Sequence, residues 1–317
     1  MTGDTPLYDV ATIGNYTKDT VVTPAGTRQV DGGGVRYAAF AAAGLGCRVA
    51  AITRLATEDS HVVEDFKTSG VDVFPVITPE STLMRLEYPT TNLDERILSV
   101  AATAGAFTVD QVRPVTARSY LISASIRGEV PNEVVGELRA TGATIALDVQ
   151  GFIRIRRPDG RLEHAQWPEL PEVLAMVDIL KTDAAEAESI TGESDIRAAA
   201  GALAAFGPRE IVLTHQGGLL VLADGEFHEA RFHPEQIVGR SGRGDTCLGS
   251  YTAARLGVPP EEAIVWAAAV TSLKMESDGP FHRDISAVID LIQRKYGLAL
   301  APPVPVSATT GARNTGA

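Results

Sequence analysis

The feature that most constrains the fold is a regular alternation of short apolar runs with segments of helical pattern. The apolar runs lie at residues 9–13, 47–53, 119–123, 144–149, 177–182 and 210–214. Helical segments follow most of them, and most of the loops between are short. Strands joined by helices lie parallel in one sheet, with helices on both of its faces. The sequence therefore predicts an α/β fold with a mainly parallel central sheet.

Two stretches depart from this alternation. Residues 16–31 and 71–107 are rich in turn residues and alternate between apolar and polar positions, as strands do. We expect them to form a small β-sheet lid, which could also pair two subunits into a homodimer. The rest of residues 1–300 then makes one domain. Residues 301–317, rich in Pro, Thr, Gly and Ala, are predicted to be a disordered tail.

Composition excludes several classes of function. The net charge is −12 and no block is rich in Lys and Arg, so nucleic acid is not an expected partner. No apolar run is long enough to span a membrane, and the first residues lack a signal-peptide pattern. Cys47 and Cys247 lie far apart in apolar segments, which predicts free thiols and a cytoplasmic protein. The six histidines lack zinc-ligand spacing.

The stretch 241–251 carries the most chemistry. Gly242 and Gly244 permit a tight turn whose N–H groups point at one spot. A helix starting near Asp245 would add its unpaired N–H groups and positive dipole end, which together favour a phosphate. Asp245 has two interpretations on this stretch alone. It caps the helix, or it is a general base that takes a proton from an attacking hydroxyl.

Other acidic and polar candidates follow predicted strands. Asp19 comes after the first strand, and Asp148 and Gln150 stand at the end of another. Loops at the carboxyl ends of parallel strands carry ligand contacts, although each residue could equally be solvated. Asp183 and Glu186 have the spacing of a helix capping box, which could explain both without a ligand.

Over residues 8–296 the chain resembles the ribokinase-like (phosphofructokinase-B type) small-molecule kinases. Four motifs occur in the family's order, namely Gly14-Asn15 with Asp19, Gly32-Gly33 before an Ala-rich helix, Asp183 with Glu186, Glu188 and Thr191-Gly192, and Gly242-Arg243-Gly244-Asp245. Tyr37, Asp148, Gln150, Phe152 and Arg154 are similar to the branch that includes inositol and cytidine kinases. The resemblance implies a three-layer α/β/α sandwich with a small β-sheet lid.

The resemblance also implies an activity and a role for each motif. The activity is ATP-dependent phosphorylation of a hydroxyl on a small molecule, with Mg²⁺ bridging the phosphates and Glu186 acting on the metal through water. Asp245 is the implied general base. The N–H groups of Gly242, Arg243 and Gly244 would hold the phosphoryl group. The implied nucleotide contacts are Thr214, Gly218 and Asp183. The implied acceptor contacts are Asp19, Gly33, Tyr37, Asp148, Gln150 and Arg154.

The sequence departs from the family pattern at four places. Arg243 replaces the usual Ala, and Asp183 replaces the usual Asn of the metal motif. Tyr37 replaces an Asn, which disfavours ribose-like recognition. Gly239 and Arg240 replace the Asp-Thr associated with a monovalent cation, so a K⁺ site is not expected.

Three functions remain open from the sequence. The preferred one is a kinase of a sugar or polyol, such as an inositol. The second is a nucleoside kinase, which Phe152 or Tyr37 stacked on a base would favour. The third is a relative that binds a metabolite without catalysis. The glycine run 32–34 has neither the Walker pattern nor the spacing of a dinucleotide fingerprint, which argues against a nicotinamide enzyme.

Overall fold

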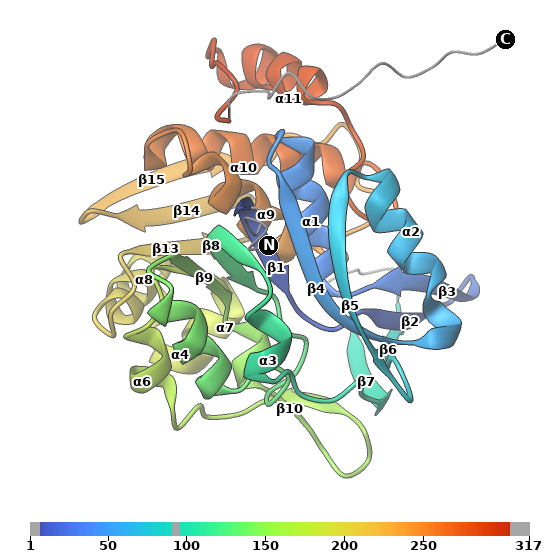
Figure 1. Cartoon of the computed structure of the whole chain (residues 1–317). Coiled ribbons are helices and arrows are strands. Elements are labelled where there is room, and N and C mark those ends of the chain that lie inside the picture. The colour runs from blue at the N-terminus through green and yellow to red at the C-terminus, as the bar shows by residue number, and fades with distance from the viewer. Residues whose placement is uncertain (1–6, 91–95, 305–317) are drawn as a thin grey trace, which may run out of the picture.

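The computed structural model describes residues 7–90 and 96–304 (Figure 1). Its central sheet has nine strands within these residues, in the order β15-β14-β13-β12-β9-β8-β1-β4-β5. In chain order they are β1 (Leu7–Ile13), β4 (Val49–Ala56), β5 (Val71–Thr78), β8 (Thr116–Ile122), β9 (Thr144–Asp148), β12 (Ile179–Asp183), β13 (Glu210–Thr214), β14 (Gly218–Ala223) and β15 (Glu226–Arg231). Every pair from β13 to β5 is parallel, and only β13-β14-β15 is antiparallel. The predicted mainly parallel sheet is confirmed.

Helices cover both faces of this sheet, because its strands are apolar on both sides. One layer contains α1 (Gly34–Gly44), α2 (His61–Thr68), α9 (Arg243–Ala254), α10 (Pro260–Met275) and α11 (Ile285–Leu291). The other contains α3 (Val109–Val112), α4 (Asn132–Ala140), α6 (Leu170–Leu174), α7 (Ala184–Thr191) and α8 (Ile196–Ala204). Figure 1 shows the two layers above and below the strands. The predicted three-layer sandwich is confirmed.

The alanine-rich α1 packs very closely on α9. A Cβ atom on Gly249 of α9 would lie 2.4 Å from the carbonyl oxygen of Ala38. Only a small side chain on one helix and none on the other allow this approach. The contact places the start of α1 beside the start of α9, where the site is built.

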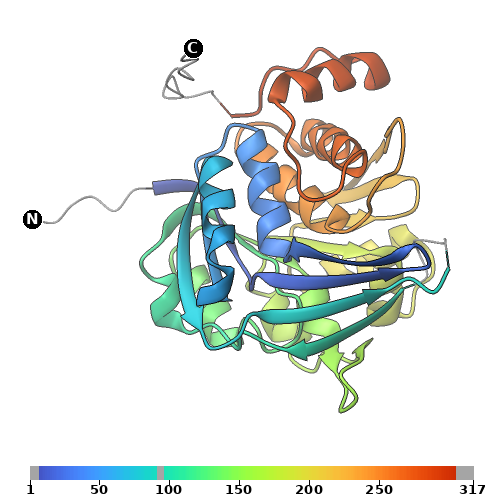
Figure 2. The same ribbon diagram turned by 90° about the vertical axis from the view of Figure 1, so that its right-hand side faces the viewer.

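A separate four-stranded sheet projects from the sandwich (Figure 2). Its order is β3-β2-β6-β7, from β2 (Thr17–Thr23), β3 (Gly26–Gly32), β6 (Thr82–Glu87) and β7 (Ile97–Ala102). The predicted lid began too early in its second part. Residues 71–78 are β5, the edge strand of the central sheet, paired with β4 along its length. Half-exposed edge strands and lid strands show the same alternation, so the pattern did not separate them.

Short elements complete the chain: η1 (Thr57–Asp59), α5 (Gln150–Ile153), the hairpin β10 (Arg154–Arg156) and β11 (Leu162–His164), and η2 (Ile292–Tyr296). The predicted disordered tail begins too early, because Val304 is buried in the core and Pro303 packs against Gly257. The remainder of the predicted tail, 305–317, lies outside the described residues. Along the described chain, no helix has both the length and the apolarity to cross a membrane.

Candidate active site

The start of α9 forms an N–H-lined turn at the carboxyl ends of the parallel strands. Gly242 is the N-cap residue and has φ 71°, a left-handed conformation that favours glycine. A Cβ on Gly242 would lie 2.2 Å from the ring of Tyr37, and one on Gly244 would lie 2.5 Å from Nζ of Lys181. Gly242 is therefore required, and a side chain at position 244 would displace Lys181. The helix begins at Arg243, within two residues of the predicted start.

Asp245 lies in the first turn of α9 but does not cap it. The N-cap is Gly242, and its turn has no side-chain cap bond. Oδ1 of Asp245 is buried without a hydrogen-bond partner, and a Cβ on Gly34 would lie 2.2 Å from it. The capping interpretation is thus excluded. The structure leaves a buried carboxylate oxygen at the start of the helix.

Charged side chains of both signs surround this carboxylate. Nζ of Lys181 lies 3.1 Å from Oδ2 of Asp148 and 3.7 Å from Oε2 of Glu186. Burial raises the pKa of Asp245, and the positive charges of Lys181 and Arg154 act in the opposite direction. Burial lowers the pKa of Lys181, but the carboxylates around it outweigh this and leave the pKa raised. Lys181 is therefore a buried ammonium directly beneath the start of α9.

A cavity on one side of Asp245, here called the cationic cavity, is lined by four basic residues. They are Arg96, Lys181, Arg240 and Arg243. Thr214, Asp183 and Glu186, the predicted nucleotide and metal contacts, also line it, together with the residues of the α9 turn. Gly218 does not line it. A Cβ on Gly218 would lie 2.2 Å from the carbonyl oxygen of Ala230, so close strand packing explains this glycine.

Asp183 and Glu186 form a capping box at the start of α7. The backbone N–H of Glu186 donates to Oδ1 of Asp183, and the N–H of Asp183 donates to Oε2 of Glu186, both at 2.8 Å. The capping interpretation of this pair is therefore correct. It does not remove them from the site, because both line the cationic cavity.

A second cavity, here called the central cavity, lies on the other side of Asp245, under the lid. Of the predicted acceptor contacts, it is lined by Asp19, Gly33, Tyr37, Gln150 and Arg154. Asp245, Gly242, Gln150 and Arg96 line both cavities. The carboxylate at 245 therefore stands where the two cavities meet.

Asp148 is not among the residues that line the central cavity, and Asp19, which does line it, lies on a different element than predicted. The carboxylate of Asp148 is instead buried against Lys181 and accepts the N–H of Gln150 at 3.0 Å. Asp19 lies on lid strand β2 rather than in a loop. Its carboxylate packs against Gly32 and Thr17, and Oδ1 is buried without a hydrogen-bond partner. Burial raises the pKa of Asp19 to about 7.

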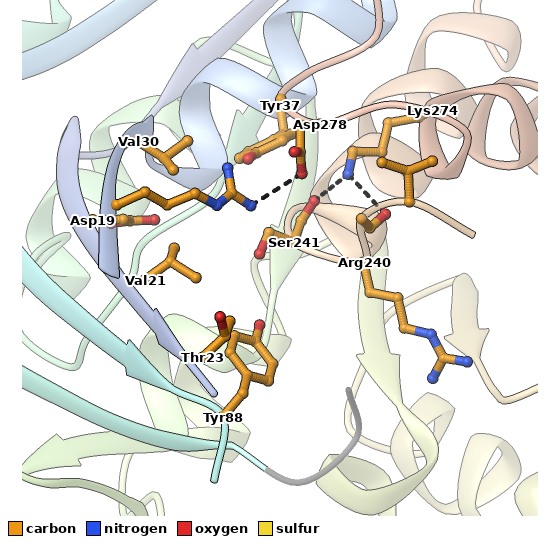
Figure 3. A pocket seen from close by; sticks show the side chains of 14 residues that line it. Asp19, Val21, Thr23, Val30, Tyr37, Tyr88, Arg240, Ser241, Lys274 and Asp278 are labelled. Atoms are coloured by element: carbon orange, nitrogen blue, oxygen red, sulfur yellow. Dashed lines mark hydrogen bonds and ion pairs between the residues drawn. The ribbon is translucent and has the colours of Figure 1, made fainter. Parts of the chain in front are cut away.

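The central cavity adjoins a third one, here called the Tyr88 cavity, which Figure 3 shows between the lid and the segment before α9. Asp19, Tyr37 and Ser241 line both. Phe152, the other aromatic candidate, lines none of the three cavities. Its ring packs on Trp167 with centroids 4.8 Å apart and is buried in the core.

Three of the polar residues that line the site were not predicted as site residues. Arg96 and Ser125 line the central cavity, and Lys181 lines the cationic one. Lys181 carried a signal, since a lysine within an apolar strand is costly to bury without partners. Arg96 and Ser125 carried none, because isolated polar residues near strand ends are usually solvated.

Metal binding by protein groups alone is not supported by the geometry. Among the described residues, no cluster of three or more His, Cys, Asp or Glu side chains is placed to hold an ion. Lys181 instead neutralises the carboxylates of Asp148 and Glu186.

Comparison with known proteins gives a consistent result. The pattern of the pfkB family carbohydrate kinases matches residues 6–283. A cytidine kinase of Thermococcus kodakarensis is 26% identical over 268 residues, which cover 81% of this chain and 92% of the relative. A sulfate complex of a pyrophosphate-dependent kinase in the ribokinase family is 31% identical, with a TM-score of 0.83, over 88% of this chain and 99% of that one.

A related structure, a pyrophosphate-dependent kinase complexed with a pyrophosphate analog and myo-inositol, is also 31% identical, with a TM-score of 0.82 over the same shares. The matched family pattern spans the lid, the capping box of α7 and the start of α9. The protein has the ribokinase-like fold and belongs to the pfkB family of carbohydrate kinases, phosphotransferases whose acceptor is a hydroxyl group.

Proposed function

We propose that this kinase phosphorylates a hydroxyl of a small polyol, such as an inositol, with Asp245 as the general base. The observation that carries the proposal is the position of Asp245 between the cationic and central cavities, with a buried oxygen that accepts no hydrogen bond. A hydroxyl bound in the central cavity would lie beside this carboxylate. A relative that binds a metabolite without catalysis would not need a buried carboxylate between the two cavities.

The proposed reaction is one in-line displacement. Asp245 takes the proton of the acceptor hydroxyl. The oxygen of that hydroxyl at the same time forms a bond to the terminal phosphorus of the donor. The bond from that phosphorus to the bridging oxygen of the donor breaks, and the shortened phosphate leaves with the electron pair. The N–H groups of the 242–244 turn and the charge of Lys181 stabilise the negative charge on the transferring group.

The donor is either ATP, as the family resemblance implies, or pyrophosphate. The position of Arg243 favours one of these two donors over the other. It lines the cationic cavity, and its guanidinium lies 6.0 Å from the ring centroid of Phe232, which lines another cavity beside the β13–β14 turn. A nucleoside attached to the donor would have to pass Arg243 to reach the cavity lined by Phe232. Pyrophosphate needs only the cationic cavity, so we favour it, as in the relatives that are 31% identical.

The cationic cavity fits a phosphate-bound Mg²⁺. Mg²⁺ is bound in such sites by one or two carboxylates, several waters and the substrate phosphates. Asp183 and Glu186 supply carboxylates at the cavity wall. Glu186 would hold a water of the ion, which when bound would offset charge on the donor phosphates.

A polyol acceptor is favoured over a nucleoside by the positions of the aromatic rings. Phe152 is packed on Trp167, and Tyr37 contacts the backbone at Gly242. Phe152 therefore offers no free face to a base, and the backbone at Gly242 lies against the ring of Tyr37. The central cavity has carboxylate, amide, guanidinium and hydroxyl groups instead, from Asp19, Gln150, Arg154 and Ser125. A nucleoside remains the second candidate, because the Tyr88 cavity adjoins the central one and has apolar walls at Val21, Val30 and Tyr88.

The test is a donor and acceptor matrix. Purified protein with Mg²⁺ is given ATP or pyrophosphate, and each of myo-inositol, hexoses, ribose, cytidine and other nucleosides. Product is detected by mass as an added phosphate. We expect the highest kcat/KM with pyrophosphate and an inositol. Turnover only with ATP refutes the donor choice, and turnover only with a nucleoside refutes the acceptor choice. Acceptor binding without any turnover supports the non-catalytic alternative.

We also propose that the lid sheet pairs two subunits. Ile97 at the start of β7 is an exposed large apolar residue on this sheet. Sedimentation equilibrium tests the proposal. We expect a dimer that Ile97→Asp dissociates, and a monomeric wild type would contradict it.

A further inference from the structure

The segment just before the N–H-lined turn, residues 238–241, has no regular structure and is tied to the end of α10. The N–H groups of Val238 and Gly239 donate to the carbonyl oxygen of Met275, at 2.9 and 3.3 Å. Nζ of Lys274 donates to the carbonyl oxygens of Gly239 and Ser241, at 3.3 and 2.5 Å. The end of α10 therefore positions this segment through its backbone.

Lys274 is unusual because it is a buried cation held by carbonyls. The residue is 1% exposed. Its Nζ lies 5.3 Å from the ring centroid of Tyr37, within the range of a cation–π contact. Figure 3 shows the side chain reaching from α10 toward the segment that contains Ser241, at the wall of the Tyr88 cavity. Carbonyl oxygens and an aromatic face are the surroundings that a bound K⁺ or ammonium ion prefers.

The hydrogen bond from Lys274 to Ser241 affects the proposed reacting centre through the peptide unit that joins Ser241 and Gly242. A trans peptide is planar, with its C=O and N–H groups pointing in opposite directions. Since the Ser241 carbonyl points at Lys274, the N–H of Gly242 points away from it. Gly242 is the N-cap of α9 and lines both the cationic and central cavities. The ammonium thus fixes the orientation of the first N–H of the turn.

We propose that Lys274 is a positioning residue that serves as a built-in monovalent cation, so that catalysis needs no K⁺ or other monovalent ion. The proposal rests on the phosphoryl transfer proposed at Asp245. Burial lowers the pKa of Lys274 to about 8, while Asp278 and Asp245 act to raise it. At neutral pH the side chain therefore still carries its charge.

The first experiment uses the wild type. Turnover is measured in KCl, NaCl, NH₄Cl and choline chloride at equal ionic strength, with whichever donor and acceptor are active. We expect rates that agree within about two-fold. Strong activation by K⁺ over choline overturns the proposal, because an ammonium already in place leaves nothing for K⁺ to do.

The second experiment removes the ammonium. Lys274→Ala leaves space for a free ion, whereas Lys274→Met fills the space with an apolar chain. We expect kcat to fall on the order of 10- to 100-fold in both, since small displacements of catalytic groups have such effects. NH₄⁺ or methylammonium should restore much of the rate to Lys274→Ala, but not to Lys274→Met. The exposed Lys67→Ala is the matched control.

A loss of rate that no small cation restores in Lys274→Ala overturns the proposal, because it shows a structural role alone. Unfolding temperatures give a readout that does not depend on turnover. NH₄⁺, compared with choline, should stabilise Lys274→Ala and leave the wild type unchanged. If no donor and acceptor pair reacts, the proposed function fails, and this thermal comparison still decides the role of Lys274. If Lys274→Ala does not fold, the ion series on the wild type decides it.

Discussion

Replacing Asp19 by Asn should make the protein more stable at alkaline pH while it weakens acceptor binding. Asp19 lines the central cavity from lid strand β2, and one of its oxygens is buried without a partner. Burial raises its pKa from 3.8 to about 7. Between these two pH values the folded protein therefore holds a proton on Asp19, and the unfolded chain releases it. Asn has the same shape and carries no charge.

The sign and size of the effect follow from linkage. Between pH 4 and pH 7 the folded state binds more protons at this site, so its contribution to stability falls as the pH rises. The rise of the Asp19 pKa from 3.8 to about 7 corresponds to a destabilisation of the folded state by about 4 kcal/mol, which is present in full above the folded pKa. Between pH 5 and pH 8 the advantage of Asp19→Asn over the wild type should grow by about 2.5 kcal/mol.

The assay is urea unfolding of both proteins at several pH values from 5 to 8. Asp159→Asn, which changes an exposed carboxylate, is the matched control. At pH 8, where Asp19 is ionised, the KM for the acceptor should rise at least about 10-fold in Asp19→Asn, because a charged hydrogen-bond acceptor is lost. If the stability difference between variant and wild type does not change with pH, the buried charge at position 19 is not what the structure indicates.

Three further predictions follow from the site. Lys181→Met should lower the free energy of unfolding by about 3–5 kcal/mol in urea titrations, because it leaves the buried carboxylates of Asp148 and Glu186 without their cation; unchanged stability would contradict this. Arg243→Ala should lower kcat/KM for pyrophosphate by about 10-fold or more and leave ATP less affected, and an equal loss for both donors would argue against a role in donor choice. The acid limb of the kcat profile against pH should lie above the ordinary range of an aspartate, because burial raises the pKa of Asp245 and only its deprotonated form accepts a proton; a limb at or below that range would contradict the assignment.

The sequence predicted the parts of the site that depend on backbone geometry. Gly242 and Gly244 were identifiable because a left-handed turn and a close approach exclude other residues. Asp245 was a candidate from its place in the same motif, but only the structure excluded its role as a helix cap. The βα alternation likewise predicted the layers, since it records which segments are buried on both faces.

The parts that depend on distant segments could not be predicted. The apolar strand around Lys181 signals a buried lysine, but its carboxylate partners lie on other elements, as do the carbonyls that hold Lys274, and no local pattern records these contacts. Gly218 looked like a ligand contact, but it is required by the neighbouring strand β15. Strand β5 was assigned to the lid because edge strands of either sheet alternate in the same way.

The central claim is that Asp245 takes the proton of the acceptor hydroxyl, and Asp245→Asn tests it most directly. The variant is expected to fold with unchanged or higher stability, because a buried charge is removed. It should still bind donor and acceptor in calorimetric titrations. Its kcat should fall by about 10²- to 10⁴-fold, the usual effect of losing a general base. A folded Asp245→Asn variant with turnover near that of the wild type would contradict the account.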